Sequence, residues 1–332
     1  MAHLVAWSNV TQSLLIPKPS LTQDNLTDQL GKVHIVTGGY AGVGKELVDI
    51  LYQHNATVYM AGRSPEKATA ALNTIKAAHP SSKGRLEFLS VDLSDLTTIK
   101  RAVQDFTAKE DRLDVLVNNA GVMAPPSGSK GKQGHELQLV TNCLGPFVLT
   151  KALLPLLRRT AASSPPGSVR VIWASSLATN LSSPTGGVQL DQKGAPVEAC
   201  LRMTNYGQSK AANLLYAVEF HRRHGGDGIL SVAFNPGNLK SELSRHMNFP
   251  AWLGIKLMCY PARYGAYTEL YSGWSPDIKM EHGGMFVIPW GRDGNYALRS
   301  DVRKAIDESS TDEASVVRRF WEWSEKETSQ YI

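Results

Sequence analysis

The chain predicts an α/β fold in which seven parallel strands form one doubly wound sheet between two layers of helices, within a single domain. Short apolar runs alternate with stretches of helical periodicity from residue 33 onward, as in a parallel sheet covered on both faces. A glycine-rich turn, Thr37-Gly-Gly-Tyr-Ala-Gly-Val-Gly44, follows the first apolar run and opens the first helix. In such a turn backbone N–H groups and a helix N-terminus can face a phosphate.

Each element follows from its pattern. The predicted strands are 33–37, 57–61, 85–91, 115–118, 169–174, 230–235 and 285–288. The predicted helices are 42–54, 65–79, 96–109, 134–159 and 206–224, with a C-terminal amphipathic helix at 314–323. Pro65 suits a first helical turn, and Ser64 before it is expected to act as the N-cap.

Three regions organise the chain. Residues 1–30 form an N-terminal extension, 31–290 the sheet domain and 291–332 a C-terminal helical extension. Within the domain, 178–203 lacks clear periodicity and is interpreted as a substrate-side insert, because long loops in compact domains are often functional. Residues 241–264 are rich in Met, Trp and Tyr; they predict a lid over an apolar substrate, with a core helix as the open alternative.

Composition excludes several classes of protein. The 35 basic and 30 acidic residues are spread along the chain, which argues against nucleic-acid binding. The three cysteines, Cys143, Cys200 and Cys259, are isolated, so neither a disulfide framework nor a metal site is expected. The sequence lacks a basic, apolar leader and an uninterrupted apolar run long enough to span a membrane. We therefore expect a cytoplasmic protein, and a peripheral contact with a membrane stays open.

The glycine turn resembles a phosphate-binding P-loop from Gly39 to Lys45, but the next position excludes that reading. A P-loop needs Ser or Thr there to hold Mg²⁺, and this chain has Glu46. The Gly-x-Gly-x-x-Gly pattern does not fit from Gly42 either, because Leu47 stands in its last place. The spacing that fits is Thr-Gly-x-x-x-Gly-x-Gly, which resembles the turn of one large family with a Rossmann-type dinucleotide-binding fold.

Further motifs follow the turn in a recognisable order. They are Asp92-Leu93-Ser94, Asn118-Asn119-Ala120-Gly121, Asn142 within Val140–Phe147, Ser175-Ser176, Tyr206-x-x-x-Lys210 and Pro236-Gly237. Together with the turn they resemble the short-chain dehydrogenases/reductases over roughly residues 30 to 290. Val43-Gly44-Lys45-Glu46 and Leu144-Gly145-Pro146-Phe147 are most similar to the retinol-dehydrogenase-like branch, which also includes fungal pathway reductases.

The resemblance implies an NADP(H)- or NAD(H)-dependent oxidoreductase with two groups of site residues. The catalytic residues would be Ser176, Tyr206, Lys210 and Asn142. The cofactor would be held by Gly38, Gly42, Val43, Gly44, Arg63, Lys67, Asp92, Leu93, Asn119, Ala120, Gly121, Tyr206, Lys210, Pro236, Gly237, Leu239 and Ser241.

The tyrosine and lysine lie one helical turn apart, so the ammonium of Lys210 can stabilise a Tyr206 phenolate. In the family's scheme the tyrosine exchanges the proton, and the lysine also binds the nicotinamide ribose. Ser176, rather than Ser175, would hold the substrate oxygen. Asn142 would complete a water-linked proton relay through Lys210.

The end of the second predicted strand favours NADP(H) over NAD(H). Arg63 and Lys67 stand there, where an acidic residue would bind an unmodified ribose. The expected activity is hydride transfer between NADP(H) and a lipophilic carbonyl or secondary alcohol, with a polyketide-like substrate of secondary metabolism in view. A catalytically silent NADP(H)-binding regulator or scaffold is the alternative; an epimerase or dehydratase fits the glycine spacing less well. A homo-oligomer is an expectation from the family.

Overall fold

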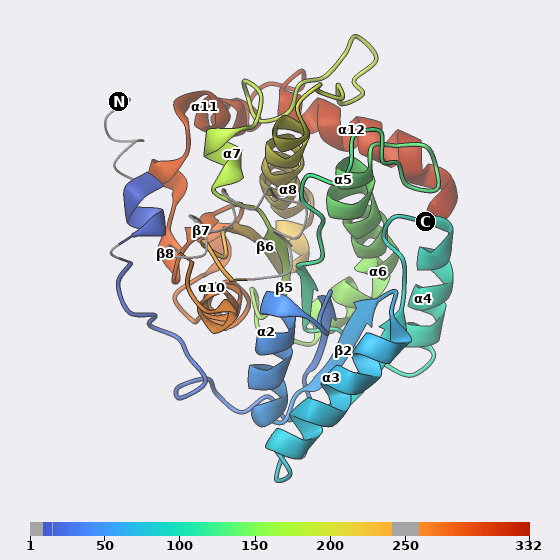
Figure 1. Ribbon diagram of the computed structural model, residues 1–332, viewed down its shortest axis with the longest axis vertical. Helices are drawn as coiled ribbons and strands as arrows, with labels where there is room; N and C mark the ends of the chain where they lie inside the picture. Colours follow the sequence, from blue (N-terminus) through green and yellow to red (C-terminus); the bar gives the residue numbers. More distant parts are fainter. Residues whose placement is uncertain (1–8, 15, 241–258) are drawn as a thin grey trace.

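The computed structural model describes residues 9–14, 16–240 and 259–332, and its centre is a single sheet in the strand order β3-β2-β1-β4-β5-β6-β7-β8 (Figure 1). The strands are β1 Val33–Thr37, β2 Thr57–Gly62, β3 Arg85–Ser90, β4 Val115–Asn118, β5 Val169–Ala174, β6 Ile229–Phe234, β7 Phe286–Ile288 and β8 Arg292–Asp293. The helices are α2 Gly42–Gln53, α3 Pro65–Ala78, α4 Thr97–Thr107, α5 Leu137–Leu139, α6 Gly145–Ala162, α7 Ala178–Leu181, α8 Arg202–His224, α10 Ala262–Trp274, α11 Ser300–Glu308 and α12 Val316–Thr328.

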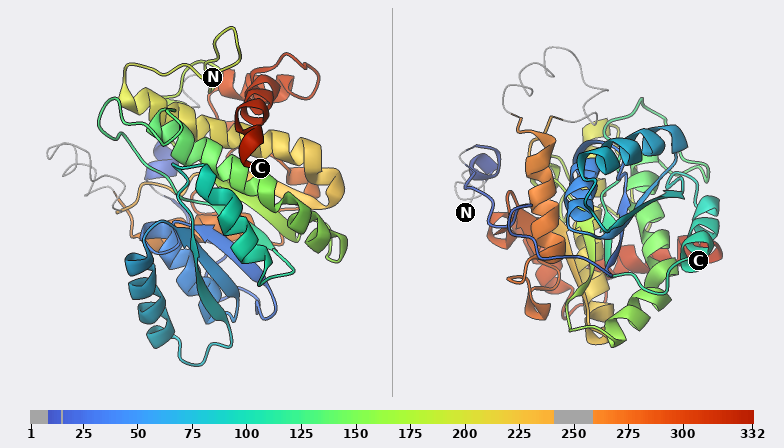
Figure 2. Two further views of the ribbon diagram at one scale, coloured as in Figure 1. Left: turned by 90° about the vertical axis from the view of Figure 1, so that its right-hand side faces the viewer. Right: turned by 90° about the horizontal axis from the view of Figure 1, so that it is seen from below.

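Helices cover both faces of the sheet, as the alternating pattern predicts. One apolar core joins the sheet to α2, α3 and α10, and the other joins it to α4, α6, α8 and α12 (Figures 1 and 2). Strands β1, β5 and β6 are buried at every residue. Because both faces of a doubly wound sheet are covered, these strands are mostly apolar and show no regular alternation of apolar and polar residues.

The sheet confirms the seven parallel strands and adds an eighth. Strand β8 runs antiparallel to β7, with Val287 opposite Asp293 and Ile288 opposite Arg292. Gly291 lies in the reversal with φ of 93°. A two-residue strand of Arg and Asp carries no apolar periodicity, so the sequence does not predict it and its residues fall within the C-terminal extension.

The long helix predicted at 134–159 is three consecutive pieces. A short α5 leads into a π-helical turn, Val140–Leu144, and α6 follows from Gly145 to Ala162. By length and hydropathy, Leu137–Ala162 passes as a candidate membrane span, yet 72% of its apolar window is buried against the rest of the chain. That burial is typical of a core helix.

Two other boundaries refine the prediction. Helix α8 begins at Arg202, one turn before Tyr206, so the insert is a short α7 followed by a loop. The hydroxyl of Ser64 accepts the Lys67 N–H at 3.4 Å, which confirms the expected N-cap of α3. Residues 241–258, most of the expected lid, lie outside the described residues.

The C-terminal helix α12 packs on α6 and α8 and covers their outer face (Figure 2). The Tyr216 and Phe320 rings stack with centroids 4.8 Å apart, and the Tyr216 hydroxyl hydrogen-bonds Ser324 at 2.7 Å. Lys151 forms an ion pair with Glu325 at 2.7 Å. The C-terminal extension is therefore an integral layer of the fold.

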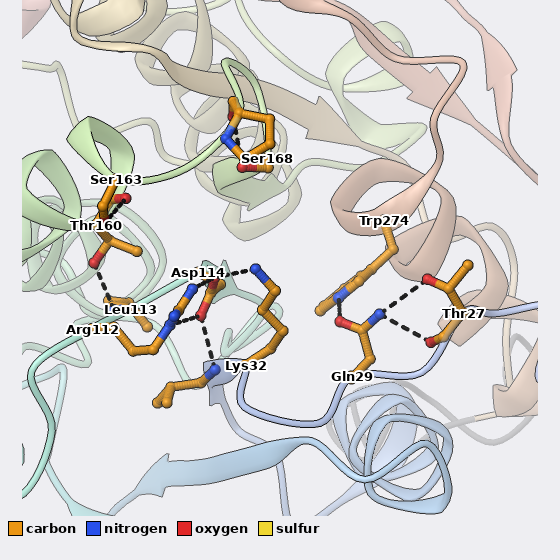
Figure 3. Close-up of polar contacts among 12 residues, drawn as sticks. Thr27, Gln29, Lys32, Arg112, Leu113, Asp114, Thr160, Ser163, Ser168 and Trp274 are labelled. Atoms are coloured by element: carbon orange, nitrogen blue, oxygen red, sulfur yellow. Dashed lines mark hydrogen bonds and ion pairs between the residues drawn. The ribbon is translucent and has the colours of Figure 1, made fainter.

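Polar side-chain contacts connect the segments at the amino end of the sheet (Figure 3). The Asp114 carboxylate, just before β4, accepts a hydrogen bond from the Val33 N–H at 2.9 Å. It also accepts two from the Arg112 guanidinium, at 2.6 and 2.9 Å. The Trp274 indole N–H donates to Gln29 at 3.1 Å. These contacts occupy the end of the sheet opposite the cavity.

Candidate active site

A cavity of about 940 Å³ lies at the carboxyl ends of the central strands. Strands β1 and β4 are neighbours although the chain runs from β1 outward to β3 before β4 begins, so this is the switch point at which such sheets bind ligands. The predicted residues that line it are Gly38, Gly42, Val43, Arg63, Lys67, Asp92, Leu93, Asn119, Ala120, Gly121, Ser176, Tyr206, Lys210, Pro236, Gly237 and Leu239. Gly44 and Asn142 lie behind this lining, and Ser241 is outside the described residues.

The glycine turn keeps side chains away from the cavity floor. Gly38 and Gly42 have φ of 68° and 53°, which few other residues adopt. A Cβ on Gly44 would stand 2.6 Å from the Asn119 side chain and 2.8 Å from the Gly38 carbonyl. The turn therefore packs tightly against β4 and leaves backbone facing the space above, a cradle that fits a dinucleotide phosphate.

Asn119 and Asp92 stabilise the neighbouring strand ends. The Asn119 side chain donates to the Thr37 carbonyl at 2.8 Å, and the Thr37 hydroxyl accepts the N–H groups of Asn119 and Ala120, each at 2.9 Å. Asp92 accepts the N–H and hydroxyl of Ser94, at 2.9 and 2.7 Å. Asp92 thus stabilises the loop after β3.

Arg63, at the end of β2, is exposed at the other end of the cavity. Its backbone N–H donates to the Tyr40 hydroxyl at 3.3 Å, and the Tyr40 ring packs against Gly62, where a Cβ would come within 2.4 Å of the ring. Tyr40 also lines the cavity. Tyr40 stands at one of the unspecified positions of the Thr-Gly-x-x-x-Gly-x-Gly spacing, so the motif does not predict that it lines the cavity.

The two serines that follow β5 have different surroundings. The Ser175 hydroxyl is buried, donates to the Lys210 carbonyl at 2.8 Å and lies 3.0 Å from the Thr179 hydroxyl. Ser176 is partly exposed and makes a side-chain hydrogen bond with Tyr206. Alternation along an extended chain turns the two side chains opposite ways.

Tyr206 and Lys210 lie on one face of α8, both almost fully buried. Burial raises the pKa of the Tyr206 phenol to about 12, and the hydrogen bond with Ser176 works against that rise. Burial lowers the pKa of Lys210 to about 8. The Lys210 ammonium donates to the Ala174 carbonyl at 2.9 Å and lies 5.7 Å from the centre of the Tyr206 ring.

Asn142 sits in the π-helical turn and is fully buried. Its side chain accepts the Val122 N–H at 2.8 Å, donates to the Val122 carbonyl at 3.0 Å and donates to the Ser209 hydroxyl at 2.9 Å. It therefore secures the loop after β4 to α8 through Val122 and Ser209. Both Asn142 and Lys210 border the space beside Gly121, since a Cβ on Gly121 would stand 3.1 Å from the Asn142 oxygen and 3.4 Å from the Lys210 nitrogen.

Comparison with known proteins settles the family. The profile described as short chain dehydrogenase matches residues 32–188. A short-chain dehydrogenase/reductase from Phomopsis amygdali is 46% identical over 98% of this chain and 97% of its own length. The chain belongs to the short-chain dehydrogenase/reductase family. Its curated relatives include several fungal members, and the family's chemistry is oxidoreduction.

Solved structures share this fold. An uncharacterised protein from Mycobacterium paratuberculosis superposes with a TM-score of 0.67 at 27% identity, over 93% of this chain and 97% of that one. The Pseudomonas aeruginosa RhlG/NADP active-site complex gives a TM-score of 0.58 at 25% identity, over 82% and 98%. Neighbours of this dehydrogenase/reductase bind nicotinamide dinucleotides.

The insert of this dehydrogenase/reductase is attached firmly to the helix that carries Tyr206. The Asn205 side chain accepts the Ala199 N–H at 2.7 Å and donates to its carbonyl at 2.9 Å. Gln208 accepts the Gln189 N–H and donates to the Val197 carbonyl, each at 2.9 Å. The loop therefore has a defined course beside the cavity.

One buried carboxyl group, that of Glu269, is not among the residues that the sequence predicts for the site. Glu269 on α10 is fully buried, and neither of its oxygens has a hydrogen-bond partner among the described residues. Burial raises its pKa well above the ordinary value, and the charge of Lys210 lowers it again. The feature of the sequence that points to Glu269 is that it is the one acidic residue of α10, where it lies between Gly265 and Gly273.

Proposed function

We propose that this short-chain dehydrogenase/reductase transfers a hydride between NADP(H) and a lipophilic carbonyl or secondary alcohol. The observation that carries the proposal is the position of Tyr206, which is buried beside Ser176 and Lys210 in a cavity that continues to Arg63. Residues of these types can donate a proton, orient an oxygen and stabilise a phenolate.

The strand order supports a dinucleotide that lies across the sheet. From the end of β2 to the end of β6 there are four steps between neighbouring strands, through β1, β4 and β5. At about 4.8 Å per step, this is about 19 Å. The adenosine end would lie near Arg63, and the nicotinamide end near Pro236 and the catalytic tyrosine.

The 2′-phosphate of NADP(H) matches the charge at the end of β2. Arg63 and Lys67 line that part of the cavity, and the β2 end Ala61-Gly62-Arg63-Ser64 contains no acid to bind an unmodified ribose. The RhlG complex, which contains NADP, offers a precedent in a structural neighbour.

The protein's own contribution to the chemistry is control of one proton. When bound, NADPH would supply the hydride. With a pKa of about 12, Tyr206 keeps its phenolic proton at neutral pH and can give it to a carbonyl oxygen held by Ser176. The ammonium of Lys210 stabilises the phenolate that remains.

The other half of the cavity supports a lipophilic substrate. Among the described residues, the charged side chains of its lining are Arg63, Lys67, Asp92 and Lys210, all at the cofactor or catalytic positions. The apolar side chains of the lining include Met123, Pro125, Pro126, Leu137, Leu177, Leu181 and Met203. Apolar walls with few polar groups are typical of ligand sites, and with the fungal relatives we infer a cytoplasmic reductase of secondary metabolism.

The test is NADPH oxidation by the purified protein over a panel of aryl and polyketide-like ketones, with Tyr206→Phe as the comparison. We expect Tyr206→Phe to reduce kcat by about 10³-fold, because a positioned general acid contributes about 10² to 10⁴. NADPH affinity, measured by fluorescence, should stay within about threefold, since the phenyl ring is kept. No oxidation of NADPH by the wild-type protein, with Tyr206→Phe indistinguishable from it, would instead favour a silent NADP(H)-binding regulator. Equal and measurable turnover by the two proteins would show that Tyr206 is not the proton donor.

A further inference from the structure

A helical turn at residues 9–13, outside the region matched by the family profile, lies beside β8 and against the carboxyl end of β6 (Figure 1). Its Gln12 side chain is 1% exposed and accepts a hydrogen bond from the Asn235 amide at 3.0 Å. The Gln12 amide nitrogen is buried without a partner among the described residues. Burying an amide N–H group that has no hydrogen-bond partner lowers the stability of the fold. A role beyond stability is therefore expected for the hydrogen bond that Gln12 makes with Asn235.

Asn235 continues this contact into the cavity. Its side-chain oxygen accepts the Gly237 N–H at 3.0 Å, and its backbone N–H donates to the Val287 carbonyl at 2.8 Å. Gly237 has φ of 91°, and a Cβ on it would stand 2.8 Å from the Trp290 ring. The Asn235 side chain therefore holds the backbone of the Pro236-Gly237 turn, and both residues of the turn line the cavity.

Two further contacts hold the N-terminal turn in place. The Thr11 carbonyl accepts a hydrogen bond from Arg292 of β8 at 2.9 Å. The Asn9 side chain accepts one from Asn180 of α7 at 3.2 Å, and Asn180 also donates to the Ala297 carbonyl at 2.7 Å. The turn thus joins β8 to α7 and to the end of β6. Of these, α7 and the residues that follow β6 contribute to the lining of the cavity.

We propose that Gln12 is a positioning residue for the nicotinamide end of the cofactor site, acting through Asn235 on the Pro236-Gly237 turn. This inference rests on the proposed function, which puts the nicotinamide at the β5 and β6 ends. Without the Gln12 oxygen, the buried Asn235 amide loses its partner and the side chain is free to leave Gly237. The adenosine end, four strands away at Arg63, is untouched by this change.

The test compares two ligands on Gln12→Met, which keeps the length of the side chain and removes the acceptor. We expect the Kd of NADPH to rise about tenfold, the loss of roughly one buried hydrogen bond. The Kd of 2′,5′-ADP, which contains only the adenosine half, should stay within about twofold. Gln12→Glu keeps an acceptor for Asn235 and should restore NADPH affinity. Val10→Ser is the matched control, because Val10 lies in the same turn with 41% of its surface exposed.

Three results would overturn the inference: an equal loss of affinity for both ligands, no loss for either, or a Gln12→Met protein that is unfolded by circular dichroism while Gln12→Glu folds. Any of these would leave Gln12 a residue of the fold only. If the wild-type protein binds neither 2′,5′-ADP nor NADPH, that result would instead count against the proposed cofactor. The two failures are therefore read from different proteins.

Discussion

The Ser175 hydroxyl donates to the backbone carbonyl of Lys210 across 2.8 Å. In the opposite direction, the Lys210 ammonium donates to the carbonyl of Ala174, the residue before Ser175, at 2.9 Å. Strand β5 and helix α8 are thus joined twice at one residue, which holds both the backbone and the side chain of Lys210. This arrangement engages Ser175 in the fold and leaves Ser176 beside Tyr206.

The serine pair can be separated by substitution. Ser176→Ala should lower kcat with NADPH and a ketone by about 10²-fold, the usual cost of one lost donor to a reacting oxygen. Ser175→Ala should instead lower the free energy of unfolding by about 1 kcal/mol in urea denaturation, because a buried hydrogen bond is lost. A larger loss of kcat in Ser175→Ala than in Ser176→Ala would reverse these assignments.

The rate of carbonyl reduction should depend on the charge of Lys210. Its pKa of about 8 means that the ammonium is present below that pH and lost above it. We expect kcat/KM for reduction to fall as pH rises through about 8, since kcat/KM reports the free enzyme. The measurement is a pH profile of wild type and Lys210→Met; a descending limb that survives in Lys210→Met must come from another group.

Arg63 should determine the preference for the phosphorylated cofactor. Arg63→Ala removes a guanidinium suited to a 2′-phosphate, so the KM for NADPH should rise about tenfold or more while that for NADH stays nearly constant. Arg101→Ala is the control, because Arg101 is an exposed arginine paired with Asp105 on α4. Equal changes with both cofactors would show that Arg63 does not contact the 2′ position.

Glu269 should make the protein less stable as pH rises. Its folded pKa lies above the ordinary 4.5, so the unfolded chain ionises first and the stability that the protonated group contributes is lost at higher pH. Glu269→Gln cannot ionise. The variant should therefore gain in unfolding free energy relative to wild type between about pH 5 and about pH 8, as measured by urea denaturation. An unchanged difference at the two pH values would mean that Glu269 is not buried in the protonated form.

Local patterns in the sequence predict most of the strands and helices of the fold. The buried runs of β1, β5 and β6, the cap of α3 at Ser64 and the glycine turn each depend on residues close together in the chain. The same holds for the spacing of Tyr206 and Lys210, because one helical turn places both on one face. Periodicity and turn chemistry are local properties, so one sequence reveals them.

Contacts between distant residues belong to the tertiary structure alone. Strand β8 forms because Gly291 turns the chain back onto β7, and its two polar residues carry no periodic signal. Gln12 meets Asn235 across 223 positions of the chain, and no spacing within the sequence predicts such a pair. The burial of Glu269 likewise depends on which helix face meets the sheet. Sequence by itself determined the fold class and the site motifs; packing decided which polar groups face the cavity and which hold it in place, because that choice depends on neighbours supplied by other elements.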